Sequence, residues 1–200
     1  RRAERDRRAG GRLSAGGYLS FQGFQAKANY HGTAVEAVLP VDILPYDDRE
    51  ETPEGIGGTL TDVEHPVTAG LDREWPILLG YQRLTAKADA TVLATIEGRP
   101  LVAVRSEGEG RTLAFASDIS PHWAPREVRA GAGYGPLFGA AGPWLAGGCR
   151  PRGGSGGSPW RQAGPSPAGL GCRLVALTQL LTCPASSCFS SLSGWAARVE

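Results

Sequence analysis

Short apolar runs separated by glycine and proline fill the first 147 residues, and this pattern predicts an α/β domain. The run RLSA ends at Gly16 and Gly17, which is typical of a buried strand followed by a tight turn. Three later runs, ATVLATI, PLVAVRS and RTLAFASD, are separated by glycine turns and predict neighbouring strands in antiparallel or mixed pairing. The sheet is therefore expected to begin with a parallel strand and to become antiparallel toward its C-terminal part.

The segments between these strands predict one short helix, one long loop and one weak helix. A helix is expected around Thr33–Val38, leading to a strand near Leu39–Leu44. The stretch DILPYDDREETPEG is polar and contains two prolines, so residues 42–55 are expected to form a loop. A C-terminal helix is expected within YGPLFGAAGPWLAGG, but it should be a poor one because it contains Pro136, Gly139 and Pro143.

Composition divides the chain into two parts. Residues 1–147 are expected to form a partial domain, and residues 148–200 a low-complexity, disordered tail. All four cysteines lie at or beyond Cys149, and Glu200 is the only acidic residue there. Within the tail, RLVALTQLL could form a helix of two or three turns. We interpret the tail as the translation of a shifted reading frame, which DNA sequencing of the gene can test.

The overall composition excludes several classes of partner. A net charge of +1 favours neither nucleic acid nor a membrane surface. No apolar run reaches 18 residues, and no apolar region follows the basic N-terminus, so a cytoplasmic protein is expected. The cysteines are separated by 23, 11 and 5 residues without a CxxC pair, so neither a metal site nor a cofactor is expected. A homo-oligomer stays open.

The candidate functional residues cluster after the predicted strands. In open α/β sheets, ligands bind at the carboxyl ends of the strands. Gly16 and Gly17 allow a sharp turn there, as in a nucleophile elbow, with Tyr18 and Ser20 as catalytic candidates and Gln22 as a ligand contact. The alternative is an ordinary turn whose aromatic side chains pack into the core.

Two further groups extend this candidate site. Asp48 and Arg49 lie in the charged run YDDREE and are candidate ligand contacts, although charge runs are usually solvated surfaces. Asp118 lies four residues before His122 and could orient it as a general base, or the two could form a structural hydrogen bond. Trp123 could stack on a sugar or another ring, or could simply pack in the core.

Five stretches of the chain, in order, closely resemble the glutamine amidotransferase-like domain proteins, bacterial relatives of the trehalose-utilisation-protein-like group in the class I glutamine amidotransferase-like superfamily. The resemblance covers about residues 9–147 and implies a flavodoxin-like three-layer sandwich that is incomplete at its N-terminus. The stretches are AGGYLSFQGFQAKANYHGTAVEAVLPV, PYDDREETPEG, HPVTAGL, WPILLGY and GRTLAFASDISPHWAP.

The resemblance places Tyr18 where glutamine amidotransferases carry their nucleophilic cysteine. No cysteine precedes Cys149, so glutaminase activity is not expected. Three functions stay open. The domain could bind a small polar molecule such as a sugar or a carboxylate, could be a hydrolase or isomerase that uses His122 with Asp118, or could be a structural or partner-binding module.

Overall fold

The computed structural model describes residues 12–107, 110–118, 122–125, 133–146 and 174–177. The main sheet has six strands in the order β10-β1-β9-β8-β7-β4. β1 pairs in parallel with β9 and β10, whereas β9, β8, β7 and β4 pair antiparallel, so the predicted mixed sheet is confirmed. The strands are β1 (Arg12–Gly16), β4 (Thr59–Leu60), β7 (Thr91–Ile96), β8 (Arg99–Glu107), β9 (Gly110–Phe115) and β10 (Leu174–Leu177).

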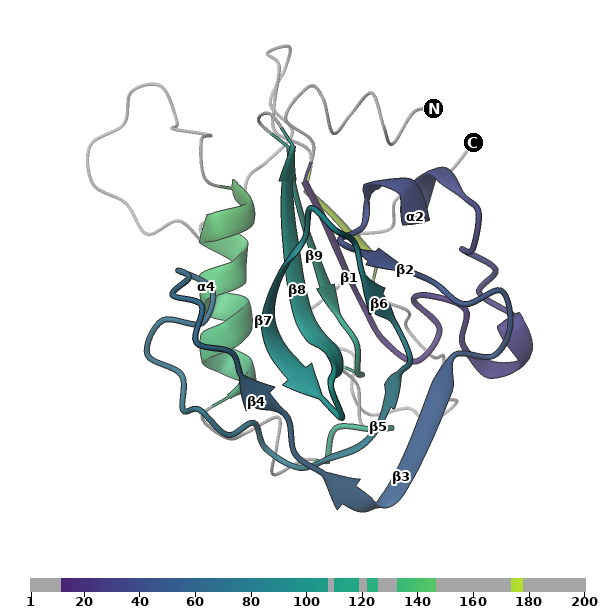
Figure 1. Ribbon diagram of the computed structural model, residues 1–200, viewed down its shortest axis with the longest axis horizontal. Helices are drawn as coiled ribbons and strands as arrows, with labels where there is room; N and C mark the ends of the chain where they lie inside the picture. The colour runs from purple at the N-terminus through teal and green to yellow at the C-terminus, as the bar shows by residue number, and fades with distance from the viewer. Residues whose placement is uncertain (1–11, 108–109, 119–121, 126–132, 147–173, 178–200) are drawn as a thin grey trace, which may run out of the picture.

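The side chains of the central strands alternate between the two faces of the sheet. Val102 and Phe115 are opposite each other on one face, and Ala103 and Ala114 are opposite each other on the other. Helix α4 (Tyr134–Ala146) covers the first face, and the short helix α2 (Ala34–Val38) lies on the second (Figure 1). The arrangement has three layers, and the predicted α/β fold class is confirmed.

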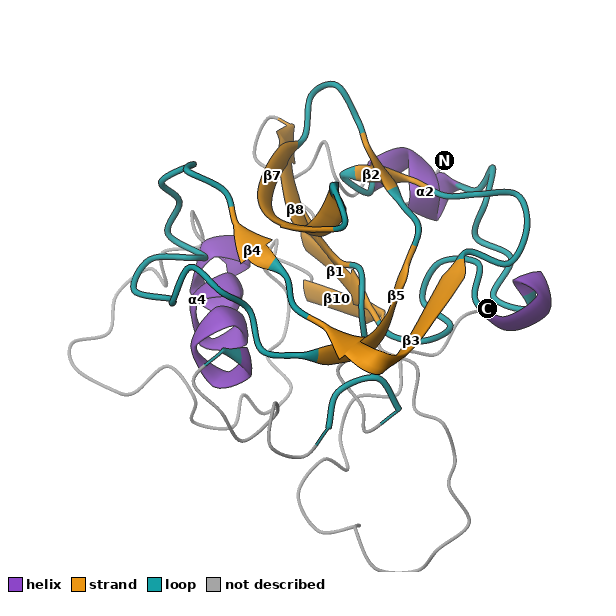
Figure 2. Cartoon of the chain, turned by 60° about the horizontal axis from the view of Figure 1, so that its bottom comes forward, coloured by secondary structure: helices purple, strands orange, loops and turns teal. Residues whose placement is uncertain are grey.

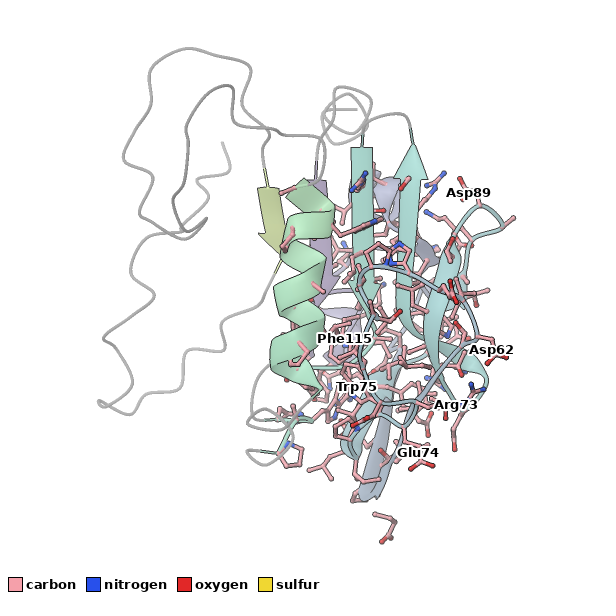
Figure 3. The ribbon with its side chains drawn as sticks, turned by 90° about the vertical axis from the view of Figure 1, so that its left-hand side faces the viewer. Asp62, Arg73, Glu74, Trp75, Asp89 and Phe115 are labelled. Carbon is pink, nitrogen blue, oxygen red and sulfur yellow. The ribbon has the colours of Figure 1, made fainter. Side chains whose placement is uncertain are left out.

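Helix α4 forms although its sequence contains two prolines and three glycines. Its buried residues Tyr134, Leu137, Ala141 and Leu145 are spaced by three and four positions, which places them on one face of the helix. This face packs on the sheet around Phe115, and Figure 3 shows Trp75 and Phe115 beside the helix. Burial of this apolar face outweighs the low helix propensity, as is common for helices in folded proteins.

Helix α2 agrees with the helix expected around Thr33–Val38. The Thr33 side chain accepts hydrogen bonds from the backbone N–H groups of Val35 and Glu36, at 3.3 Å and 3.5 Å, and so caps the first turn. At the other end, the ammonium group of Lys87 donates to the backbone oxygens of Glu36 and Leu39. Both ends of this five-residue helix are therefore stabilised by side chains.

Two small antiparallel pairs flank the main sheet: β2 (Val41–Asp42) with β6 (Thr85–Ala86), and β3 (Arg49–Ile56) with β5 (Leu78–Gln82). The β3–β5 ribbon is seen in Figure 2. The prediction of a loop over residues 42–55 is wrong for β3. β3 has no fully buried residue, and its sequence therefore shows no alternation of apolar and polar positions that would indicate a strand. Pro53 is tolerated because it lies where the pairing with β5 is irregular.

The apolar stretch after Cys172 also differs from its prediction. Leu174–Leu177 form β10, which pairs in parallel with β1 along four residues, instead of a helix. Four apolar residues do not distinguish a buried strand from a helical turn, and the free edge of β1 decides between them. The cysteines and the rest of residues 148–200 lie outside the described residues. Among the described helices, none combines the length and apolar character needed to cross a membrane.

Candidate functional site

The turn after β1 places Tyr18 at the carboxyl edge of the main sheet. β1 ends at Gly16, and the Ser20 N–H donates to the Gly17 oxygen at 2.9 Å, which closes a tight turn. Gly17 has a φ of 140°, a backbone conformation that other residues rarely adopt. At Gly16, a Cβ would lie 3.2 Å from the Cβ of Phe115 on β9. The predicted turn after a parallel strand is therefore confirmed. The backbone conformation at Gly17 and the close approach of Phe115 at Gly16 explain why both positions are glycine.

Arg49, the first residue of β3, contacts Tyr18 directly. One guanidinium nitrogen donates to the Tyr18 hydroxyl and also to a carboxylate oxygen of Glu51, the latter at 2.9 Å. The Nε and the other terminal nitrogen donate to the two oxygens of Asp47, at 3.0 Å and 2.9 Å. Two carboxylates thus compensate the positive charge of Arg49, whose side chain is only 15% exposed.

Aromatic rings surround this hydrogen bond. The centroid of the Tyr18 ring lies 4.2 Å from that of His122 and 5.1 Å from that of Trp123. The Arg49 guanidinium lies 5.0 Å from the Tyr18 ring centroid and 4.5 Å from the Phe24 ring centroid, close enough for a cation–π contact with each. Tyr18 is partly buried, whereas His122 and Phe24 are exposed. The structure therefore brings Tyr18, Arg49, His122 and Trp123 together, from three separate segments of the chain.

Trp123 is 1% exposed, and its contacts connect the site to the β3–β5 ribbon. Its indole N–H donates to Glu51 at 2.8 Å, and its backbone oxygen accepts from the Leu79 N–H at 2.9 Å. The ring packs against Gly80, where a Cβ would lie only 2.3 Å from the indole nitrogen. With its ring buried in this way, Trp123 packs in an edge contact against the Tyr18 ring and does not offer a face for stacking on a ligand.

Asp48 fixes the segment that follows the turn. Its fully buried carboxylate accepts the backbone N–H groups of Gln22 and Gly23, at 2.9 Å and 2.7 Å. Burial raises the pKa of Asp48, and these two hydrogen bonds oppose that rise. The Gln22 side chain, also buried, accepts the His31 N–H at 3.2 Å. In this structure Asp48 and Gln22 hold the loop in place instead of facing solvent.

Ser20 and Asp118 are each 2% exposed. The Asp118 backbone oxygen accepts the Tyr134 hydroxyl at 2.6 Å, at the start of helix α4. Residues 119–121, which separate Asp118 from His122 in the sequence, lie outside the described residues. The pairing of Asp118 and His122 as an acid–base couple stays a prediction.

Burial and charge determine the protonation of the site. Burial raises the pKa of Tyr18 above its ordinary value, although Arg49 opposes this rise. The phenol is therefore protonated at neutral pH and is a poor nucleophile. The Arg49 hydrogen bonds lower the pKa of Asp47 to about 2, so this carboxylate stays charged. Because the Tyr18 oxygen accepts from Arg49, its own proton is available for an acceptor outside the network.

Sequence interpretation missed two residues of this site, Phe24 and Gln82. Phe24 belongs to a 3-10 turn (Phe24–Ala26) in which Gln25 and Ala26 have φ values of 53° and 58°. Gln82 is the last residue of β5 and is fully buried beside the turn. The position of Gln82 at the end of an apolar strand was the one available signal, since polar residues at strand ends often line sites.

Away from Tyr18, a hollow of about 430 Å³ lies beside helix α2 and is lined by residues including His31, Glu36 and Lys87. The two Glu36 oxygens accept the backbone N–H groups of Gly32 and Ile43, both at 2.6 Å. Glu36 and Lys87, two of the charged residues that line the hollow, thus form hydrogen bonds with the protein backbone. Among the described residues, no group of three or more His, Cys, Asp or Glu side chains could hold a metal ion.

Two solved structures are similar to this chain. A cytoplasmic protein from Salmonella typhimurium LT2 is 43% identical over 72% of this chain, with a TM-score of 0.66, and a second cytoplasmic protein from Salmonella typhimurium is 41% identical over 66%, with a TM-score of 0.62. The chain spans 58% and 54% of those two proteins. No curated protein matches the sequence. Residues 5–146 match the profile of one family, and this chain belongs to it: the family described as putative glutamine amidotransferase.

Proposed function

We propose that this domain binds a small, uncharged polar molecule at the carboxyl edge of the main sheet and does not hydrolyse glutamine. The observation that carries the proposal is the Tyr18–Arg49 hydrogen bond, with the charge of Arg49 compensated by Asp47 and Glu51. A protonated phenol stands where the resemblance expects a thiolate. It can donate a hydrogen bond to a ligand, but it cannot replace a thiolate in attack on an amide.

The charges around Tyr18 favour a neutral ligand over an anionic one. Asp47 and Glu51 are partly exposed, with side chains 35% and 49% accessible, and they would repel a ligand carboxylate. The same oxygens can accept hydrogen bonds from ligand hydroxyl groups. A sugar or another polyhydroxylated molecule therefore fits this site better than a carboxylate.

A thermal unfolding assay with a ligand panel tests this proposal. Neutral sugars at concentrations well above the dissociation constant are expected to raise the Tm of the 200-residue chain by several degrees, since about 2.7 kcal/mol of stabilisation is reached at 100 times Kd. Carboxylates are expected to give smaller shifts. Tyr18→Phe should abolish the sugar effect because it removes the donor, and Tyr81→Phe is the matched control because the Tyr81 hydroxyl bonds to Glu97.

Three results would contradict the proposal, two from this assay and one from a separate glutaminase assay. A panel without any shift would refute ligand binding, and an equal shift in Tyr18→Phe would place the ligand elsewhere. Ammonia release from glutamine by the wild-type chain would refute the loss of glutaminase activity.

A second candidate, a hydrolase or isomerase, is favoured by one observation. The exposed His122 ring lies 4.2 Å from Tyr18, where a ligand bound to the phenol would also meet an imidazole. In that case His122→Ala should abolish turnover while the Tm stays unchanged. Unchanged turnover would reject His122 as the base. We place either function in the cytoplasm, because both Salmonella relatives are named as cytoplasmic proteins.

A further inference from the structure

Gln82 connects the Tyr18 turn to a neighbouring strand of the sheet. Its backbone N–H donates to the oxygen of Ala116, directly after β9, at 2.7 Å. Its side-chain amide donates to the oxygen of Gly17, directly after β1, at 2.7 Å. One fully buried residue at the end of β5 therefore ties together the ends of two parallel strands.

The bond from Gln82 to Gly17 is not needed to satisfy a buried carbonyl group. The Gly17 oxygen already accepts the Ser20 N–H at 2.9 Å, within the turn itself. Gln82 supplies a second donor to the same oxygen, from a strand that is 65 positions away in the sequence. A second donor restricts the orientation of the Gly17 peptide group, since its oxygen must keep good hydrogen-bond geometry with two donors at once.

Retaining an amide at position 82 has a cost in stability. The Oε1 atom of Gln82 is buried and has no hydrogen-bond partner among the described residues. A buried acceptor without a partner is destabilising, and an apolar residue of similar size would avoid this. Folding alone therefore does not explain why the residue is a glutamine.

We propose that Gln82 is a positioning residue for the ligand site: by fixing the carbonyl of Gly17 it sets the direction in which Tyr18 leaves the turn toward Arg49 and His122. The reason is the backbone at Gly17, whose φ of 140° belongs to a region that glycine explores with little steric restriction. Without the bond from Gln82, rotation at Gly17 would move the phenol away from Arg49. The consequence for binding rests on the proposed function, whereas the positioning of Tyr18 does not.

The test follows the Tyr18 ring by NMR in the full chain, with tyrosine labelled at the ζ carbon with ¹³C. The chain has five tyrosines, and the signal missing from Tyr18→Phe identifies Tyr18. In Gln82→Met, which keeps the size but loses the donor, the Tyr18 signal is expected to shift or broaden. Its titration midpoint should also change, because release of the phenol removes both the burial that raises the pKa of Tyr18 and the Arg49 contacts that lower it. The other four signals should keep their positions.

Thr112→Val is the matched control. Thr112 is also buried and also has a side-chain oxygen without a partner among the described residues, but it lies within β9. Its replacement should leave the Tyr18 signal unchanged. An unchanged Tyr18 signal and midpoint in folded Gln82→Met would overturn the proposal, as would an equal change in Thr112→Val.

A second variant, Gln82→Glu, keeps the test decisive if Gln82→Met fails to fold. A protonated glutamic acid can donate to Gly17, and an ionised one cannot. The Tyr18 signal should therefore match wild type when the new carboxyl group is protonated and depart from it on ionisation; a signal that ignores this ionisation would overturn the proposal. Sugar binding separates the two proposals: a changed Tyr18 signal with no sugar-induced Tm shift in wild type would support the positioning and refute the binding.

Discussion

The α4 side of the main sheet and the carboxyl edge around Tyr18 are stabilised by different interactions. On the α4 side, large apolar side chains such as Leu113, Phe115 and Leu137 are fully buried and contact one another. At the edge, Tyr18 and Arg49 are held by charged and hydrogen-bonded groups, with Asp48 buried among backbone N–H donors. Stability and site geometry therefore have separate sources in this domain, so they should respond to different substitutions.

The largest effect on stability is expected on the α4 side. Leu113→Ala should lower the free energy of unfolding by about 2–5 kcal/mol, because it removes buried methyl groups and leaves a cavity. Urea denaturation measures this loss. Val63→Ala is the control, since Val63 is 45% exposed and should change the free energy by about 0.5 kcal/mol or less. A loss below about 1 kcal/mol in Leu113→Ala would show that this side is not the main source of stability.

Gly80→Ala connects the two regions and should have an intermediate effect. The new methyl group would lie 2.3 Å from the Trp123 indole nitrogen, so the indole must move and its hydrogen bond to Glu51 must weaken. We expect a loss of about 1–3 kcal/mol, together with a change in the near-ultraviolet circular dichroism of Trp123. In Gly139→Ala, where a Cβ meets no atom within 4 Å, helix α4 should gain stability instead. Equal effects of the two substitutions would contradict the close contact at Gly80.

The smallest effect is expected from acidification of the edge. The pKa of Asp47 is lowered from 3.8 to about 2 by its hydrogen bonds with Arg49, so the carboxylate stabilises the folded state above about pH 4. This contribution should disappear as the pH falls from about 4 to 2, and solvent exposure of Asp47 limits it to about 1 kcal/mol or less.

The measurement is the difference in Tm between wild type and Asp47→Asn across that pH range, which should narrow toward pH 2. The exposed pair of Asp62 with Arg73, seen at the outer side of the molecule in Figure 3, provides the control. Asp62→Asn should change the Tm little at any pH. A constant difference between wild type and Asp47→Asn would show that the Asp47–Arg49 pair does not stabilise the fold.

Local sequence predicted the elements whose residues repeat with a clear period. The strands β7, β8 and β9 carry alternating or continuous apolar residues between glycine turns, and helix α2 has a threonine cap, so each was predicted close to its place. β3 and β10 were not predicted as strands. β3 is polar because it forms the outer strand of a ribbon, and β10 is only four residues long. In both cases pairing with a distant strand, not the local pattern, determines the conformation.

The candidate site follows the same division. The residue pattern alone predicts that a glycine turn follows a buried strand and presents Tyr18, since turn chemistry is local and depends on residue type. Tertiary contacts, by contrast, are what bring Arg49 to this phenol, bury Trp123 against its ring, and let the Gln82 side chain donate to Gly17 in the turn. The pairs Tyr18–Arg49, Tyr18–Trp123 and Gly17–Gln82 are 31, 105 and 65 positions apart in the sequence. Local periodicity carries no information about contacts across such separations.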